Sequence, residues 1–599
     1  MIFYDFEVFK YDWLVVNVDT DTHEETIMHN DPHQLHKFYS NHFDDIWCGY
    51  NNKHYDQYIL RAILLGMNPK DISDKIIIKH MEGWQISREL ANTHMINYDV
   101  MPSDMKSLKV LEGFCGHNIK ETSVPFDIDR RLTQEEIEET IKYCQNDVYE
   151  TINIFMENID QFNAMFGIIK AFPDMVSMRD IGDSEARLTA KVLGCNKTEY
   201  HDEFDFYVLP CVDIKKYHAV VEWFEACAKE AAELDLNHAD DATKREWYKS
   251  KSFTIDVAGV PHTFGFGGMH GAPLDPIHRI GAMYHVDVNN YYPSFLIAHG
   301  MVTRSAMNDN YPKVYITRKN LKHMQTHAKT KEEAKEYKKA QLPYKKMLNA
   351  LSGAMKDKNN PAYDPRNNNI MCINGQLMLL DLIEHLEVIP DFELDQSNTD
   401  GLIVMIPDID EAFEMLDDIC YDWECRMSTN LCDIRLETDQ IRELYQKDVN
   451  NYLWIDLDGG IERKGAYVKE LNTLDYDLPI LNVALVDYMT KNVPVEDTIN
   501  HCDDLIMFQK IVKLSNRYEY VEHNGIKYDY KCYRVFASRD AKDGKILKCR
   551  SGNNPAKFGN TPDCCFIENG DITSMLVPDK LDRQWYIDLA KKRLQDFGL

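Results

Sequence analysis

The chain of 599 residues lacks the features that mark several protein classes. With only 21 prolines and 27 glycines and no internal repeat, it does not resemble a disordered, repetitive or low-complexity protein. Its 15 cysteines are scattered and never spaced as CxxC, so neither a disulfide framework nor a zinc site is indicated. No apolar run approaches the length of a membrane span, and the first residues, MIFYDFEVF, carry acids where a signal peptide needs an apolar segment. We therefore expect an intracellular globular protein in a reducing compartment, with no membrane as its partner.

The sequence also lacks the excess of basic residues that is usual in proteins that bind nucleic acid. Its 67 lysines and arginines face 98 acids, which gives a net charge of −31. Lysine is nevertheless concentrated in 331–346 and in 542–557. Such runs are more often solvated surface than binding sites, so the charge alone decides nothing. The length predicts roughly three to five domains, each with its own core.

Four acids and a tyrosine fall on three predicted elements of an N-terminal α/β domain. Asp5 and Glu7 share one face of a first strand, and Asp56 opens a helix that follows a third strand. Tyr143 and Asp147 lie one turn apart on a later helix. Each acid alone has an ordinary explanation, such as helix capping. Together, four carboxylates can hold two divalent cations about 3.5–4 Å apart, an arrangement that cleaves phosphodiesters.

A second group of polar residues follows in 281–406. A buried strand, Met283–Val288, carries Asp287 near its end and leads through an Asn-Asn turn into a helix with Pro293 in its first turn. A lysine-rich helix follows, from Thr330 towards Met355 and interrupted by a proline. One of its faces carries Lys345, Asn349 and Ser352, and Lys338 lies two turns earlier on about the same side.

Two short strands in 392–406 then form a hairpin whose turn contains Asp400. The simple explanations are that Asp287 caps a turn, that the lysines are solvated and that Asp-Gly only closes the hairpin. These explanations stay open for each motif taken alone.

In their order and spacing, these motifs resemble those of phage-type family B DNA polymerases with an N-terminal 3′–5′ proofreading exonuclease. The resemblance covers residues 5 to about 470. It implies a multidomain α/β and α+β fold, in which an RNase H-like exonuclease domain precedes a right-hand polymerase of palm, fingers and thumb. The implied domains are exonuclease 1–160, linker and first part of the palm 161–280, palm 281–315, fingers 316–358, palm 359–465, and thumb with C-terminal helices 466–599.

The resemblance assigns a role to each matching residue. The catalytic residues are Asp287 and Asp400 for polymerisation, and Asp5, Glu7, Asp56, Asp147 and Tyr143 for the exonuclease. Two Mg²⁺ or Mn²⁺ ions are implied at Asp287, Val288 and Asp400, and two divalent cations at Asp5, Glu7, Asp56 and Asp147. Nucleotide binding falls to Tyr292, Lys338, Lys345 and Asn349, with Tyr292 excluding a ribose 2′-hydroxyl. DNA contacts fall to Asn52, Ser107, Leu108, Gly267, Gly268, Tyr452 and Lys464, and the lysines of 542–557 are expected to contact the duplex backbone.

Five positions depart from the family pattern. Asn398 replaces the first acid of the hairpin motif, and Ala350 and Ser352 replace a serine and a tyrosine on the lysine-rich helix. Asn450 replaces the lysine of a lysine-x-tyrosine element, for which Lys447 or Lys464 could substitute. Phe266-Gly267-Gly268 resembles the family's tyrosine-x-glycine-glycine linker, but Gly265 stands where that linker has its tyrosine.

The implied partners are primer-template DNA, dNTPs and replisome proteins, and the chain is expected to act as a monomer. The short interval from Asp287 to Lys345 leaves no room for the insertion used in protein priming, so no terminal protein is expected. A phage-encoded protein of this kind would act in the cytoplasm of an infected bacterium. Two alternatives remain: an exonuclease whose degenerate polymerase half is a DNA-binding platform, and an acidic interaction protein without catalysis.

Overall fold

The structure is a computed structural model that describes residues 1–599. It is a mixed α/β protein with four sheets, and it divides into two compact units. Unit 1 comprises Met1–Phe166, Ser177–Gly182 and Leu471–Lys591, and unit 2 comprises Gly167–Val176, Asp183–Glu470 and Lys592–Leu599. None of the helices combines the length and the apolar character needed to cross a membrane.

The N-terminal part of unit 1 is built on a five-stranded sheet of order β3-β2-β1-β4-β5. β1 pairs antiparallel with β2 and parallel with β4. The strands are β1 Ile2–Val8, β2 Trp13–Asp19, β3 Glu25–His29, β4 Ile46–Gly49 and β5 Ile96–Asp99. The predicted third strand is therefore the fourth, because the sequence analysis missed β3, a short and mostly half-buried edge strand.

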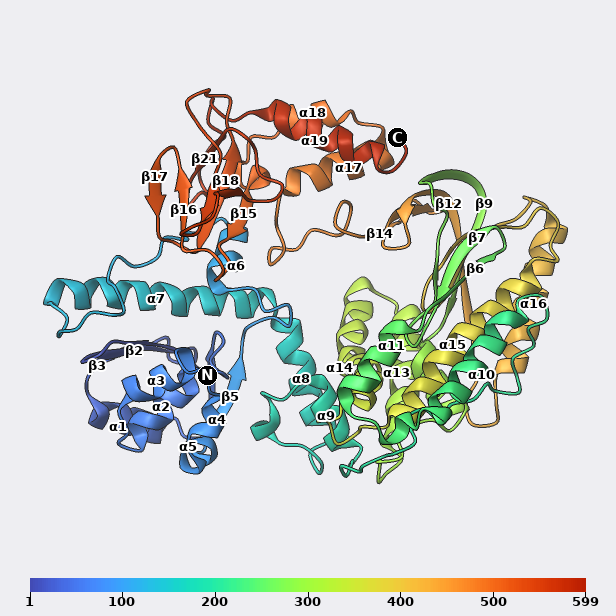
Figure 1. Ribbon diagram of the computed structural model, residues 1–599, viewed down its shortest axis with the longest axis horizontal. Helices are drawn as coiled ribbons and strands as arrows, with labels where there is room; N and C mark the ends of the chain where they lie inside the picture. Colours follow the sequence, from blue (N-terminus) through green and yellow to red (C-terminus); the bar gives the residue numbers. More distant parts are fainter. The chain divides into compact units, whose positions relative to one another are not determined.

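Helices cover this sheet. The long α7 packs on β1 and β2, and α2 and α3 also contact β1 (Figure 1). A capping box of Thr133 and Glu136 starts α7, and Gly66 adopts a left-handed conformation just after α2. The helices are α1 Pro32–Asn41, α2 Asp56–Leu64, α3 Pro69–Ile77, α4 Gly83–Ile86, α5 Arg88–Asn92, α6 Leu108–Phe114, α7 Gln134–Glu157 and α8 Ile159–Ala171.

The C-terminal part of unit 1, predicted as a thumb with C-terminal helices, contains α17, α18 and α19 and also two small sheets of orders β15-β18-β21 and β17-β16-β19-β20, which the sequence analysis did not predict. Their strands are short and some are buried on both faces: all six residues of β18 are buried, so the alternation that marks a strand is absent. The elements are α17 Pro479–Lys491, α18 Val495–Asn500, β15 Lys510–Lys513, β16 Tyr520–His523, β17 Ile526–Tyr528, β18 Cys532–Ala537, β19 Leu547–Cys549, β20 Ala556–Lys557, β21 Cys565–Ile567 and α19 Arg583–Gln595.

Unit 2 contains a nine-stranded antiparallel sheet of order β14-β13-β12-β9-β11-β10-β8-β7-β6. Next to the middle strand β11 lies β9, which is longer than the predicted strand and ends at the same residue, Val288. The strands are β6 Phe253–Val257, β7 Val260–Phe264, β8 His270–Gly271, β9 Ile277–Val288, β10 Glu393–Ser397, β11 Gly401–Met405, β12 Leu436–Asp448, β13 Asn451–Asp456 and β14 Ile461–Lys464.

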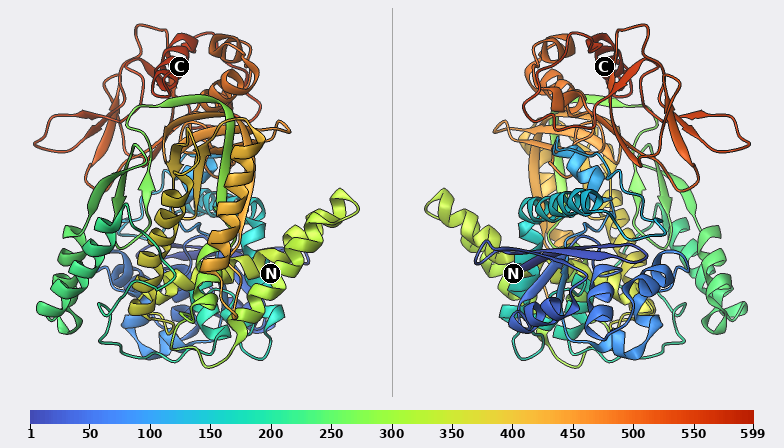
Figure 2. Two further views of the ribbon diagram at one scale, coloured as in Figure 1. Left: turned by 90° about the vertical axis from the view of Figure 1, so that its right-hand side faces the viewer. Right: turned by 90° about the vertical axis from the view of Figure 1, so that its left-hand side faces the viewer.

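The helices of unit 2 include an antiparallel hairpin of α13 and α14 whose tip extends away from the sheet (Figure 2). Thr330 caps α14 as predicted, but the helix is not interrupted at Pro343, which is buried inside one continuous helix. The helices are α9 Glu185–Val192, α10 His218–Glu233, α11 Asp241–Ser250, α12 Tyr291–Ala298, α13 Asn310–Thr326, α14 Lys331–Lys356, α15 Pro365–Leu386 and α16 Asp410–Met427.

Candidate functional site

The four N-terminal acids form one cluster in unit 1. Glu7, Asp56 and Asp147 are buried and Asp5 is half-buried, and the backbone N–H of Phe6 donates to Asp56 Oδ1 at 3.2 Å, which ties the start of α2 to β1. Burial, reinforced by the charges of the neighbouring acids, raises the pKa of Asp5 and of Glu7 well above their ordinary values. Burial also raises the pKa of Asp56 to about 7. Carboxylates brought this close repel one another, and a cation between them would remove the repulsion.

A thiol lies beside this cluster. Cys144 Sγ donates to the backbone oxygen of Asp5 at 3.3 Å and to its Oδ2 at 3.5 Å. Ligand atoms of Asp5, Glu7 and Cys144 lie within 4.8 Å of one another. Burial raises the pKa of the thiol, so Cys144 stays protonated and supports Asp5 as a hydrogen-bond donor. The ligands left for a metal are carboxylate oxygens, which suit hard divalent cations.

Lys109 also contacts the cluster, and the sequence analysis missed it. Its Nζ lies 2.7 Å from Asp147 Oδ1 and 3.0 Å from Oε2 of the buried Glu112, and 4.8 Å from the centroid of the Tyr143 ring. Burial followed by the charge of Asp147 raises the pKa of Tyr143, so its phenol is protonated. Lys109 directly follows the predicted Ser107 and Leu108, which was the available signal.

The predicted DNA-contacting residues of unit 1 occupy different environments. Ser107 is the N-cap of α6, and its side chain makes no capping hydrogen bond, while Leu108 is the first residue of that helix. Asn52 is fully buried, and its Nδ2 donates to Asn97 Oδ1 at 2.9 Å. In this structure Asn52 therefore holds the loop before α2 and has no surface to offer to DNA.

The lysines of 542–557 are largely occupied by partners within the protein. Lys545 and Lys557 both pair with Asp563, at 3.4 and 2.6 Å. Lys548 lies over the rings of Tyr518 and Phe558. The positive charge of this stretch is thus smaller than its composition suggests.

In unit 2 the ladder between β9 and β11 brings the two predicted polymerase acids together. Gly401 is the register partner of Asp287, and the backbone N–H of Val288 donates to the carbonyl oxygen of Asp400 at 2.8 Å. The turn between the strands is held by Asn398, whose Oδ1 accepts from the N–H groups of Asp400 and Gly401, each at 2.9 Å. Asp287 and Asp400 therefore lie side by side at the end of the sheet.

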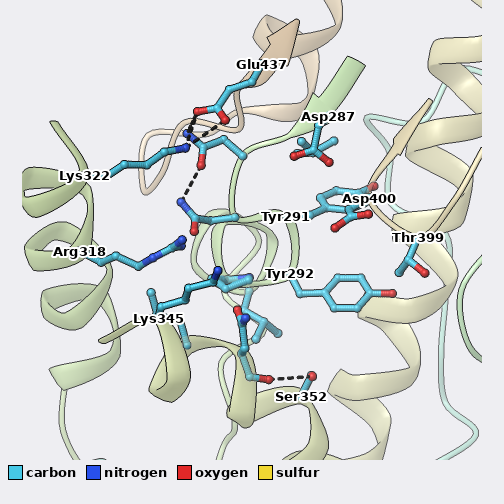
Figure 3. A pocket seen from close by; sticks show the side chains of 17 residues that line it. Asp287, Tyr291, Tyr292, Arg318, Lys322, Lys345, Ser352, Thr399, Asp400 and Glu437 are labelled. Atoms are coloured by element: carbon cyan, nitrogen blue, oxygen red, sulfur yellow. Dashed lines mark hydrogen bonds and ion pairs between the residues drawn. The ribbon is translucent and has the colours of Figure 1, made fainter. Parts of the chain in front are cut away.

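These acids line a cavity of about 390 Å³ that also contains a row of cations (Figure 3). Asp287 and Asp400 lie on one side, and Arg318 and Lys322 of α13 with Lys345 of α14 lie on the other, where Glu437 pairs with Lys322. The residues lining the cavity are Asp287, Val288, Asn289, Asn290, Tyr291, Tyr292, Pro293, Leu296, Arg318, Lys322, Lys345, Leu348, Asn349, Ser352, Thr399, Asp400 and Glu437. Lys338 is exposed and not among them.

Electrostatic effects differ between the two sides of the cavity. Burial, followed by the charges of Asp400 and Glu437, raises the pKa of Asp287 to about 7. Partial burial, followed by the nearby cations, lowers the pKa of Lys345. Each side repels further charge of its own sign, so the cavity suits a ligand that brings cations to the acids and anions to the bases.

Sequence reasoning missed Arg318, Lys322 and Glu437. Glu437 is the register partner of Asp287 in the ladder between β9 and β12, a pairing across a long stretch of chain that local patterns do not reveal. Arg318 and Lys322 are four residues apart on α13, a spacing that places both on one helix face and was the available signal.

The two neighbouring tyrosines are arranged differently. The hydroxyl of the buried Tyr291 donates to the carbonyl oxygen of Gly375 at 2.6 Å. Tyr292 is half-buried and lies against Gly375, where an added Cβ would come within 3.3 Å of its ring. Figure 3 shows the Tyr292 ring below the acids. The glycine of α15 thus makes room for the ring.

The predicted glycine linker, Gly265–Gly268, lies against the turn between β10 and β11 that contains Asp400. Gln376 Nε2 donates to the carbonyl oxygens of Gly265 and Gly267, at 2.8 and 2.9 Å. A Cβ on Gly268 would lie 2.6 Å from Thr399 Oγ1, so a larger residue would displace the turn that bears Asp400.

A second cavity, of about 790 Å³, is lined by Asp287 and Asp400 together with Tyr452 and Lys464. Tyr452 and Lys464 are register partners on β13 and β14. Lys447 pairs with Asp448 at 2.9 Å instead. Of the two lysines that could substitute for the one replaced by Asn450, Lys464 is the one that lines a cavity with Asp287 and Asp400.

The oxygen ligands of unit 2 also fit hard divalent cations. Asp287 and Asp400 supply adjacent carboxylates, and the pKa of Asp287 is raised by burial and then by the charges of Asp400 and Glu437, which a bound cation would offset. Val288 has only its main-chain carbonyl to offer as a ligand.

Comparisons with known proteins add little to this geometry. No protein-family model matches the sequence, and no curated protein matches it. Among solved structures, the family B DNA polymerase from the hyperthermophilic archaeon Pyrobaculum calidifontis aligns with 100% of this chain and 77% of its own, at 12% identity and a TM-score of 0.41. A TM-score below 0.5 is too low to argue from, so the proposal below rests on the residues of the site.

Proposed function

We propose that the chain is a template-directed DNA polymerase that extends a primer 3′-hydroxyl with dNTPs and also carries a 3′–5′ proofreading exonuclease. The observation that carries this proposal is the cavity of unit 2, in which Asp287 and Asp400 face Arg318, Lys322 and Lys345. A nucleoside triphosphate with its bound cations has the matching distribution of charge.

The residues of the cavity have separate tasks in this proposal. Asp287 and Asp400 would hold two Mg²⁺ or Mn²⁺ ions, with the Val288 carbonyl as a further ligand, and the basic side chains would neutralise the phosphates. When bound, such ions stabilise the charge that develops on the attacking and leaving oxygens. Tyr292 excludes a ribose 2′-hydroxyl by its bulk, while Asn349 lies on the same helix face as Lys345, towards the base of the nucleotide. Tyr452 and Lys464 line the second cavity, on the side from which the primer would approach.

The acid cluster of unit 1 supports the exonuclease activity. Asp5, Glu7, Asp56 and Asp147 would hold two divalent cations, and Tyr143 would contact the reacting phosphate through its protonated hydroxyl. Lys109 orients Asp147 and Tyr143, and Ser107 and Leu108 at the start of the same helix would contact the single-stranded end. Asn52 supports this site from within the loop.

The domain assignments follow from the same proposal. The strand order β3-β2-β1-β4-β5 with its mixed pairing supports an RNase H-like exonuclease domain. The nine-stranded sheet would be the palm, the hairpin of α13 and α14 the fingers, and the sheet-containing region after Glu470 would take the place of the thumb.

The hydrogen bonds of Asn398 favour this proposal over a degenerate polymerase half. Asn398 accepts two backbone N–H bonds that a carboxylate would accept in the same way. An asparagine in place of the family's acid therefore leaves the turn and the position of Asp400 unchanged. The site loses one negative charge and keeps its geometry.

A primed template assayed with and without Mg²⁺ tests the proposal. We expect template-directed dNTP incorporation and 3′-end digestion, both dependent on the metal. Digestion without incorporation would favour the exonuclease with a degenerate polymerase half, and the absence of both activities would favour a non-catalytic interaction protein.

A further inference from the structure

Glu437 holds two parts of the cavity of unit 2 at once. Its carboxylate oxygens accept hydrogen bonds from Lys322 Nζ at 2.7 and 3.0 Å, and Oε1 also accepts from Asn289 Nδ2 at 2.8 Å. Lys322 comes from α13, while Asn289 belongs to the turn that follows Asp287. One carboxylate therefore ties the helical hairpin to the turn beside the catalytic acid (Figure 3).

The other cations of the cavity have no comparable partner. The Nε of Arg318, one turn before Lys322, is buried without a hydrogen-bond partner. Besides burial, the largest effects on the pKa of Lys345 come from cations, namely Arg318, Lys338, Lys322 and Lys346. Burial lowers the pKa of Arg318, an effect that the charge of Glu437 partly offsets, but Lys322 is the cation that Glu437 holds in a direct ion pair.

We infer that Glu437 is an internal counter-ion that competes with the incoming nucleotide for Lys322. Glu437 holds Lys322 while the cavity is empty and yields it to the phosphates when a nucleoside triphosphate enters. The inference rests on the proposed function, since it specifies how that site takes its substrate.

The ion pair is suited to such an exchange. The side chain of Lys322 is 36% exposed and that of Glu437 45% exposed, so water screens their attraction and the pair is weak. A lysine ammonium is a compact charge on a flexible stem, which can change partners without loss of geometry. A triphosphate carries several charges against the single charge of Glu437, whereas inorganic phosphate competes poorly. The pair therefore favours triphosphates over smaller anions.

The Glu437→Gln variant isolates this effect. The glutamine keeps an oxygen that accepts from Asn289, so the turn is retained while the charge that neutralises Lys322 is lost. We expect the KM for dNTPs to fall roughly twofold to fivefold without an increase in kcat, and inhibition by tripolyphosphate to strengthen by a similar factor. The matched control is Glu443→Gln, on the same strand but paired with His278 and Tyr445, which should leave both quantities at the parental values.

A double-mutant cycle tests whether the effect passes through Lys322. Lys322→Met alone should weaken tripolyphosphate binding, and Glu437→Gln should tighten it clearly less in the Lys322→Met background than in the parent, because Glu437 then acts only at a distance, on groups such as Arg318. Equal tightening in both backgrounds would contradict the inference. An unchanged affinity for tripolyphosphate in Glu437→Gln alone would do so as well.

Calorimetric titration of the full chain with tripolyphosphate separates this inference from the proposed function, because it requires no catalysis. If the parent protein incorporates no dNTP, the proposed function fails, and the titration still decides whether Glu437 competes for Lys322. If the parent is active and the titration shows no difference between the parent and the Glu437→Gln variant, only the inference fails.

Discussion

The backbone N–H of Val288 donates to the carbonyl oxygen of Asp400 at 2.8 Å, across the ladder of β9 and β11. This bond fixes the end of one strand against the turn before the other, so the carboxylates of Asp287 and Asp400 cannot separate without breaking the sheet. The acids come from residues far apart in the chain, yet the central strands of a sheet hold them, which is a rigid support for a catalytic site.

Loss of the acids on β1 should remove exonuclease activity alone. We predict that Asp5→Ala combined with Glu7→Ala lowers 3′–5′ digestion by more than about a hundredfold, because two metal ligands are lost. DNA synthesis should continue, since the cluster belongs to unit 1 and the polymerase cavity to unit 2. Digestion of a labelled single strand beside primer extension by the same preparation measures both, and digestion at the parental rate would show that the nuclease site is misassigned.

Tyr292→Val should relax the discrimination against ribonucleotides. Removal of the ring opens the space beside Gly375, and we expect the ratio of rNTP to dNTP incorporation efficiency to rise about tenfold or more. The control is Tyr291→Phe, which keeps the buried ring and loses only its bond to the Gly375 carbonyl. An equal ratio for Tyr292→Val and the parent on one template would refute the role of Tyr292, and a raised ratio for Tyr291→Phe would reassign it.

Arg534 should be essential for the stability of unit 1. Its buried guanidinium donates to the carbonyl oxygens of His117 and Gly570, each at 2.7 Å, and of Gly113 at 3.2 Å, so it joins the end of α6 to the C-terminal sheets. Arg534→Met leaves these acceptors unsatisfied, at a cost of about 3 kcal/mol or more. Calorimetry should show a lower Tm for the variant.

The exposed Arg539→Met serves as the control for Arg534 and should melt like the parent. Because α6 also carries Lys109 to the acid cluster, exonuclease activity should be lost at a lower temperature in Arg534→Met. Identical melting of Arg534→Met and Arg539→Met would show that the carbonyl bonds do not stabilise the unit.

Asp395 should make the stability of unit 2 depend on pH. Its carboxylate is buried on β10 without a hydrogen bond, and Arg279 Nε lies 3.4 Å away in a poorly aligned ion pair. Burial raises the pKa of Asp395 from 3.8 to about 6. As the pH rises between these values the unfolded chain releases this proton first, so the contribution of Asp395 to stability falls and is then constant above about pH 6.

Asp395→Asn removes this pH-dependent contribution. We expect the variant to match the parent near pH 4 and to exceed it by on the order of 2 kcal/mol at pH 7 to 8. Thermal unfolding across this pH range measures the difference. A variant that is less stable than the parent at pH 8 would mean that the pair with Arg279 outweighs the cost of burying the charge.

The local features of the sites were predictable from the sequence because they depend on nearby residues. The strand that ends after Asp287, the turn before Asp400 and the capping box of α7 each follow from turn chemistry and periodicity. The prediction that these elements form functional sites rested on the order of the motifs, which resembles that of a polymerase family.

The missed features depend on pairing between distant residues. Glu437 acquires its place from the register with Asp287, which leaves no local pattern. Lys109 acquires its place from packing of α6 near α7, and its only local signal is that it follows Ser107 and Leu108. The C-terminal sheets were missed because strands such as Cys532–Ala537 are buried on both faces and show no alternation. The burial of Asn52 was equally hidden, since its partner Asn97 lies on another strand.

Primer extension by the parent and by Asp400→Asn, on one primed template with Mg²⁺ and dNTPs, tests the central claim most directly. The asparagine keeps the shape of the side chain and removes its charge from the site. We predict template-directed extension by the parent and a loss of more than about a hundredfold in Asp400→Asn, with 3′-end digestion unchanged. Failure of the parent to extend the primer, or near-parental extension by Asp400→Asn, would contradict the assignment of this cavity as a polymerase site.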